Sequence, residues 1–155
     1  MPLGRYLEAG LSIGLGSDVA AGPDLSIFGA MRVGASTQNA LRVVRGDPEP
    51  ALDPLGWLRL ATLGGATCLG LEDRIGSIEV GREADLIAVD ASMTEPMAVE
   101  PVNNRGPVGV TSDGTQASVQ DASALLSRLI FRAHPDMVRA AWVRGRGLAG
   151  PRLAP

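Results

Sequence analysis

The stretch LSIGLGSD, residues 11–18, decides the fold of this chain. Residues 11–16 are apolar and rich in glycine, which is typical of a strand buried in a parallel sheet. Asp18 follows this strand directly, and α/β enzymes display charged groups just beyond the carboxyl ends of such strands. The stretch therefore predicts an α/β fold with Asp18 as a metal ligand or proton carrier. A cap or turn aspartate is the alternative reading of the same residue.

A long helix is expected next, over about residues 25–44. Asp24 or Ser26 could cap its N-terminus, and its apolar positions fit one face only loosely. These positions are Phe28, Met31, Ala35 and Leu41. Another apolar pattern predicts a helix over residues 122–132, which His134-Pro135 stops because a residue before proline avoids the helical conformation.

The helix that begins after Asp53 has the clearest boundaries. Asp53 is a good N-cap, and Pro54 occupies the favoured first position. Gly64-Gly65 is expected to break this helix. A short helical turn then ends at Gly70, which can adopt the left-handed conformation that follows many helices.

The apolar pattern changes its period after residue 74. Ile78 and Val80 alternate with polar residues and predict a short strand, while residues 84–90 predict a more buried one. A further strand is expected over residues 137–143, with Arg144-Gly145 as a tight turn to a return strand. Residues 91–120 predict a long irregular insertion, because they hold several prolines and many small polar residues.

Composition excludes several kinds of site. The chain has 155 residues, a net charge of −3, one cysteine and one histidine, so it can form neither an internal disulfide nor a zinc site from several of its own histidines. The acidic charge gives no reason to bind nucleic acid or an anionic membrane. No apolar run approaches the roughly 20 residues that span a bilayer. We therefore expect a soluble, cytoplasmic protein without nucleic-acid or membrane partners.

The other reactive side chains are assigned structural roles. Cys68 lies in an apolar helical turn with no histidine near it in sequence, which favours a buried and inert thiol. His134 is expected to be a solvated loop histidine, and Asp85 a turn or hairpin residue. Residues 72–74 are interpreted as a solvated charge cluster. The chain thus offers one candidate metal-site carboxylate, Asp18, and no complete catalytic constellation.

Four motifs, in this order, resemble the C-terminal part of the amidohydrolase superfamily. GLGSDVAAG at residues 14–22 resembles its last barrel strand, and residues 60–71 resemble the helices that follow. IGSIEVGREADL at residues 75–86 resembles the start of its β-sandwich, and residues 138–148 are similar to the closing hairpin. The combination is quite specific for the superfamily.

The resemblance implies an α/β fold in two parts. Residues 1–74 would form the final strand and helices of a TIM-barrel metal-dependent hydrolase. Residues 75–155 would form part of its composite β-sandwich, with the insertion at about 91–120. The family's histidine ligands and catalytic glutamate precede the final strand, and His134 matches none of them. We therefore expect a C-terminal part of a longer enzyme, inactive alone, with apolar surface exposed around residues 11–15.

Within the superfamily, GSDVAAG at residues 16–22 and ATLGGA at residues 61–66 look most like the guanine deaminases. This implies hydrolytic deamination of guanine, a small purine, to xanthine and ammonia by a zinc-activated water, in a parent that is commonly a homodimer. Asp18 matches the family's aspartate, which would bind the single zinc and carry a proton from the water to the leaving amine. Two alternatives stay open: another aminohydrolase or chlorohydrolase acting on a purine, pyrimidine or triazine, and a non-catalytic interaction module.

Overall fold

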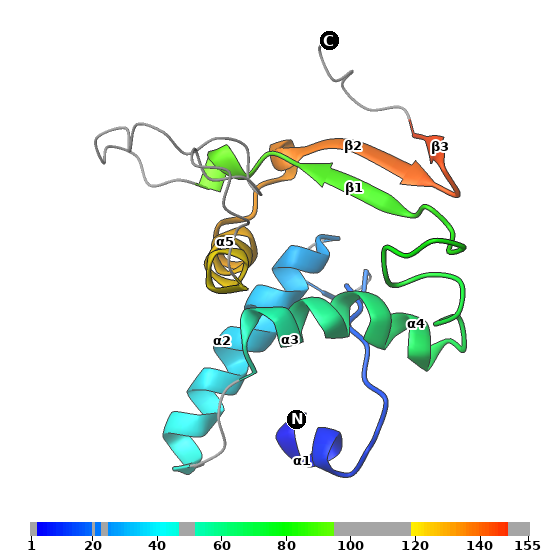
Figure 1. The fold of residues 1–155 in the computed structure, drawn as a ribbon. Helices are drawn as coiled ribbons and strands as arrows, with labels where there is room; N and C mark the ends of the chain where they lie inside the picture. Colours follow the sequence, from blue (N-terminus) through cyan, green and yellow to red (C-terminus); the bar gives the residue numbers. More distant parts are fainter. Residues whose placement is uncertain (1–2, 20, 23–24, 47–51, 95–118, 149–155) are drawn as a thin grey trace.

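The computed structural model describes residues 3–19, 21–22, 25–46, 52–94 and 119–148. In Figure 1 a small antiparallel sheet lies above a group of helices. The elements, in chain order, are α1 (Leu3–Glu8), α2 (Ile27–Arg45), α3 (Pro54–Arg59), the π turn η1 (Leu60–Gly64), α4 (Gly65–Cys68), β1 (Leu86–Val89), the 3-10 turn η2 (Ala91–Thr94), α5 (Val119–Arg132), the 3-10 turn η3 (Pro135–Met137), β2 (Val138–Val143) and β3 (Arg146–Gly147).

Helices α2, α3 and α5 pack together and enclose the core, to which α1 adds one residue. The buried apolar residues of this core are Leu3, Met31, Ala35, Trp57, Leu60, Leu126 and Ile130. The Ser26 side chain accepts a hydrogen bond from the Gly29 N–H, which confirms Ser26 as the N-cap of α2, whereas Asp24 lies outside the described residues. The predicted inner face of α2 is confirmed at Met31 and Ala35, while Phe28 and Leu41 are half-buried.

The helix from residue 54 onward is continuous, so the predicted break at Gly64-Gly65 is wrong. Both glycines keep helical backbone angles, near φ −60° and ψ −44°. Its start and end are as predicted: Asp53 Oδ1 accepts from the Gly56 N–H at 2.7 Å. Gly70 has φ +67° and donates to the Thr67 carbonyl, as a glycine just past a helix end does.

Cys68 is exposed, and the prediction of a buried thiol is also wrong. It lies about three α-helical turns after the buried Trp57, and a regular helix would put both residues on one face. The intervening π turn takes about one extra residue, which rotates everything beyond it by about 100°. Cys68 therefore points away from the core.

Two predicted strands are not formed. Residues 11–16 have no strand partner among the described residues, because a parallel strand needs neighbours to complete its ladder. Ile78 and Val80 are exposed in a turned segment, so neither side chain faces a core.

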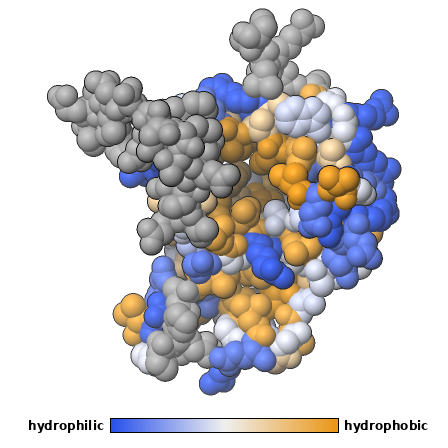
Figure 2. All heavy atoms as spheres, viewed as in Figure 1, coloured by the Kyte–Doolittle hydropathy of each residue, from blue (hydrophilic) through white to orange (hydrophobic). Residues whose placement is uncertain are grey.

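Figure 2 shows hydrophobic residues gathered on the viewed face of the molecule. Leu11 is 53% exposed, in line with the expected apolar surface, while Ile13 and Leu15 pack partly against the core.

The strands predicted over residues 84–90 and 137–143 and the return strand after Gly145 are present, and they form one sheet in the order β1-β2-β3. All its pairs are antiparallel, with Leu86 opposite Trp142 and Val143 opposite Arg146. Arg144 and Gly145 form the predicted turn, with φ of 51° and 74°. Helix α5 ends at Arg132, just before His134-Pro135, as predicted. Most of the predicted insertion lies outside the described residues, and the division at residue 74 stays a prediction.

Candidate functional site

Asp18 lies in a tight turn at the end of the segment 11–17. Its backbone has a φ of 50°, and its carbonyl oxygen accepts hydrogen bonds from the N–H groups of Ala21 and Gly22 at 2.8 and 2.5 Å. A side chain at Gly22 would meet the Ser17 carbonyl oxygen at 1.8 Å, so only glycine fits the return of this turn. The Asp18 side chain is exposed. A positive φ outside glycine is uncommon, and such backbone is concentrated at functional sites.

The segment that carries Asp18 is joined to the π turn. The Leu15 N–H donates to the Leu60 carbonyl at 3.1 Å, and Leu60 is the first residue of η1. Single π turns inside α-helices occur frequently at functional sites. The backbone of residues 11–17 is thus positioned by helical residues that follow it by about fifty positions in the sequence.

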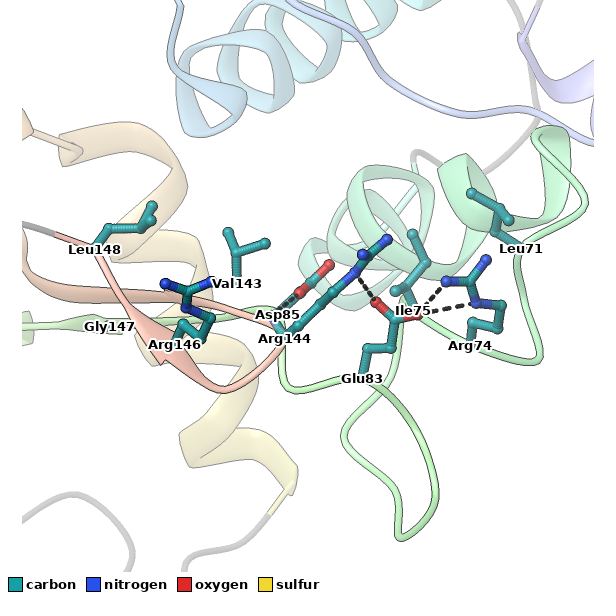
Figure 3. Close-up of a pocket in the computed structure, with 10 residues that line it drawn as sticks. All are labelled: Leu71, Arg74, Ile75, Glu83, Asp85, Val143, Arg144, Arg146, Gly147 and Leu148. Carbon is teal, nitrogen blue, oxygen red and sulfur yellow. Dashed lines mark hydrogen bonds and ion pairs between the residues drawn. The ribbon is translucent and has the colours of Figure 1, made fainter.

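A pocket of about 530 Å³ lies between the loop of residues 71–85 and the β2-β3 hairpin (Figure 3). Leu71, Ile75, Val143 and Leu148 give it apolar walls, and the rest of the lining consists of arginine and carboxylate side chains and Gly147. Its volume is in the range of small-molecule sites. It contains neither Asp18 nor any other residue of the Asp18 turn.

Glu83 connects the two sides of this pocket. It accepts from Arg74 Nε at 2.9 Å, pairs with another nitrogen of the same guanidinium, and accepts from Arg144 Nε at 2.8 Å (Figure 3). The hydrogen bond from Arg74, and then that from Arg144, lowers the pKa of Glu83. Asp85 accepts the backbone N–H of Arg144 at 2.7 Å, which confirms its hairpin role.

Sequence reasoning missed Glu83, because no local pattern signals its pairing with an arginine 61 residues away. The interpretation of residues 72–74 as a solvated cluster is confirmed at Asp73 and Arg74, which are exposed, although Arg74 is also ion-paired with Glu83. It is wrong at Glu72, which is half-buried. The ion pairs of Glu83 with Arg74 and Arg144 hold the loop to the hairpin, so the geometry gives these three residues a structural role.

His134 is exposed, as predicted, and its Nδ1 accepts a hydrogen bond from the Asp136 N–H at 3.3 Å at the start of η3.

Asp90 accepts hydrogen bonds from Ser92 Oγ at 2.6 Å and from Arg139 at 2.8 Å. The hydrogen bond from Ser92, followed by that from Arg139, lowers the pKa of Asp90 to about 2. Asp90 thereby ties the end of β1 to β2 and has a structural role.

The described residues contain no group of three or more histidine, cysteine, aspartate or glutamate side chains that could hold a metal ion. Asp18, Cys68, Asp85 and His134 therefore do not form a metal-binding group with one another. A carboxylate such as that of Asp18 could supply one ligand to a metal, with the others coming from elsewhere. No helix in the described part of the chain is long and apolar enough to cross a membrane.

The sequence profile of the amidohydrolase family matches residues 1–146, so the chain belongs to this family. Among curated proteins it is 33% identical over 146 residues to the "Probable guanine deaminase" of Schizosaccharomyces pombe, covering 94% of this chain and 25% of that protein. It is 47% identical over 88 residues to the 5-methylthioadenosine/S-adenosylhomocysteine deaminase of Desulforudis audaxviator, covering 56% of this chain and 19% of that protein.

The fold comparison agrees. The structure superposes on an adenosine deaminase from Xanthomonas campestris with bound zinc, with a TM-score of 0.66 and 33% identity, over 99% of this chain and 29% of that one. The predicted fold class, part of an amidohydrolase barrel enzyme, is confirmed. The chain spans about a quarter of the length of the proteins that it matches.

Proposed function

We propose that this chain supplies the last metal ligand, Asp18, to a zinc-dependent hydrolytic deaminase of purines. The observation that carries the proposal is the Asp18 turn: an exposed carboxylate on left-handed backbone, at the end of a segment fixed to a helix. This segment lies within the part of the chain that matches the amidohydrolase family.

Asp18 would have two roles in this reaction, metal binding and proton transfer. One carboxylate oxygen would bind zinc, which lowers the pKa of a bound water toward neutrality. The carboxylate would then take a proton from the attacking water and pass it to the departing amine, so that the C–N bond breaks and ammonia leaves. An exposed carboxylate on a fixed turn suits this exchange, because its oxygens are open to a ligand while its backbone is restrained.

Guanine is the proposed substrate, because the relative matched over 94% of this chain is named a guanine deaminase. A second candidate is 5-methylthioadenosine or S-adenosylhomocysteine, favoured by the higher identity of 47% to the Desulforudis audaxviator enzyme over a shorter stretch. The non-catalytic alternative gains no support from these matches. A homodimeric parent and a cytoplasmic location stay predictions.

Chimeric enzymes test the proposal. The chain replaces the matching C-terminal segment of each of these two relatives, and guanine and 5-methylthioadenosine are assayed with both chimeras. We expect activity in at least one chimera, and the host that accepts the chain better indicates the substrate class.

The ligand role is tested in the active chimera with Asp18→Asn. This change removes the charge but keeps a residue that tolerates left-handed backbone. We expect kcat/KM to fall by about 10²-fold or more, with loss of bound zinc. Asp73→Asn, at another exposed aspartate, is the control and should change neither. Near-normal turnover of the Asp18 variant would exclude the proposed role.

A further inference from the structure

Three glycines lie where the segment 11–17 meets the π turn, and we name Gly14, Gly64 and Gly65 the glycine contact. A side chain added at Gly14 would lie 2.7 Å from Gly65 Cα and 3.1 Å from Gly65 N. One added at Gly64 would lie 2.5 Å from the Ile13 carbonyl oxygen. The two backbones therefore touch each other directly, with no side chain between them.

This close approach has a consequence for the hydrogen bond beside it. The Leu15 N–H reaches the Leu60 carbonyl at 3.1 Å across the same contact. Carbon atoms prefer separations of about 3.5–4.0 Å, so a methyl group at Gly14 or Gly64 would push the segment outward by about 1 Å. Since the neighbouring atoms are backbone, no side chain can rotate to make room.

Asp18 lies three residues beyond Leu15, at the end of the segment that this contact holds. We propose that Gly14 and Gly64 are positioning residues for Asp18: they set the distance of its segment from the helix and so the place of its carboxylate. The proposal rests on the proposed function of Asp18 as a metal ligand. A misplacement of about 1 Å in a catalytic group can cost about 10²-fold in rate.

Gly65 offers a matched control within the same contact. A side chain at this position would point away from the segment, with only the Leu60 carbonyl oxygen near it, at 4.0 Å. Gly64→Ala and Gly65→Ala thus make the same chemical change at adjacent helical positions. Only the first obstructs the segment.

The first measurement is amide hydrogen exchange in the 155-residue chain. We expect the Leu15 amide to exchange about tenfold faster or more in Gly14→Ala and Gly64→Ala, and at the original rate in Gly65→Ala. The two obstructing variants lie on opposite sides of the contact, so either one suffices if the other does not fold. Equal exchange in all three variants would overturn the proposal.

The second measurement is made in the active chimera described above, with zinc affinity and kcat as readouts and the Gly65 variant as reference. The obstructing variants should bind zinc at least about tenfold more weakly and lose kcat more than they raise KM. Faster exchange at Leu15 with unchanged zinc affinity would overturn the positioning role. Retention of activity by Asp18→Asn would instead defeat the proposed function, and the exchange data would still test the contact.

Discussion

Replacing Gly34 with alanine tests how tightly α2 packs against α3. The added methyl carbon would lie 2.6 Å from Cζ3 and 2.8 Å from Cη2 of Trp57, whose side chain is buried. Overpacking of this kind costs about 1–3 kcal/mol. Alanine also favours a helix over glycine by about 1 kcal/mol. The expected net result is a loss of about 1 kcal/mol of unfolding free energy, made of two effects of opposite sign.

A double-mutant cycle separates these effects. With Trp57→Leu as background the obstructing ring is gone, so Gly34→Ala should raise the unfolding free energy by about 1 kcal/mol. Urea unfolding followed by circular dichroism gives each value, and an unchanged m-value shows that the variants expose the same surface on unfolding. Ser36→Ala, at an exposed position of α2, reports the gain from helix propensity alone. If Gly34→Ala has the same effect in both backgrounds, the contact with Trp57 is not what limits this position.

Three further predictions concern stability. Asp53→Ala should lower the unfolding free energy by about 1 kcal/mol through loss of the N-cap, while Asp53→Asn should stay near the original value; equal losses would exclude capping. Gly70→Ala should lower the unfolding free energy, measured in urea, by about 1 kcal/mol, because alanine is strained at a φ of +67°. No atom lies within 4 Å of the new side chain, so this loss reports the backbone strain alone, and no loss would show that the backbone relaxes. Asp90 has its pKa lowered from 3.8 to about 2, so its stabilising contribution is present above pH 3.8 and disappears as pH falls toward 2. Asp90→Asn should therefore reduce the loss of stability on acidification across this window, relative to Asp73→Asn, and an unchanged pH profile would refute the role of its hydrogen bonds.

Local chemical signals were enough to predict much of the fold. Asp53-Pro54 marks a helix start, and Gly70 a helix end, from a few neighbouring residues. Arg144-Gly145 likewise marks a hairpin turn. Each of these features depends on backbone conformations that the residues themselves prefer, so no knowledge of the rest of the molecule is needed.

The features that were not predicted depend on distant partners. Gly64 and Gly65 were interpreted as helix breakers because their contact with Gly14, fifty residues earlier, leaves no trace in the local pattern. Cys68 was misplaced because its direction depends on a π turn that residue types do not announce. The alternation at Ile78 and Val80 resembles a strand, but a strand also needs a partner and a core to face.

The candidate site was likewise predictable only in part. The motif at residues 14–22 predicted Asp18 as a site residue, and the structure adds the left-handed backbone and the hydrogen bonds that restrain it. The remaining groups needed for catalysis could not be predicted, because the described residues contain no group of three or more side chains that could hold a metal ion.

The π turn also bears on how relatives of this chain should be aligned. A deletion of one residue between Leu60 and Gly64 would return the helix to regular α geometry and rotate α4 by about 100°. The buried Ala66 would then leave the core, and the close approach of Gly76 to Ala66 and Leu63 would be lost. A one-residue gap at this place therefore marks a reoriented helix and not a shortened loop, so insertions and deletions here should be counted as changes to the site.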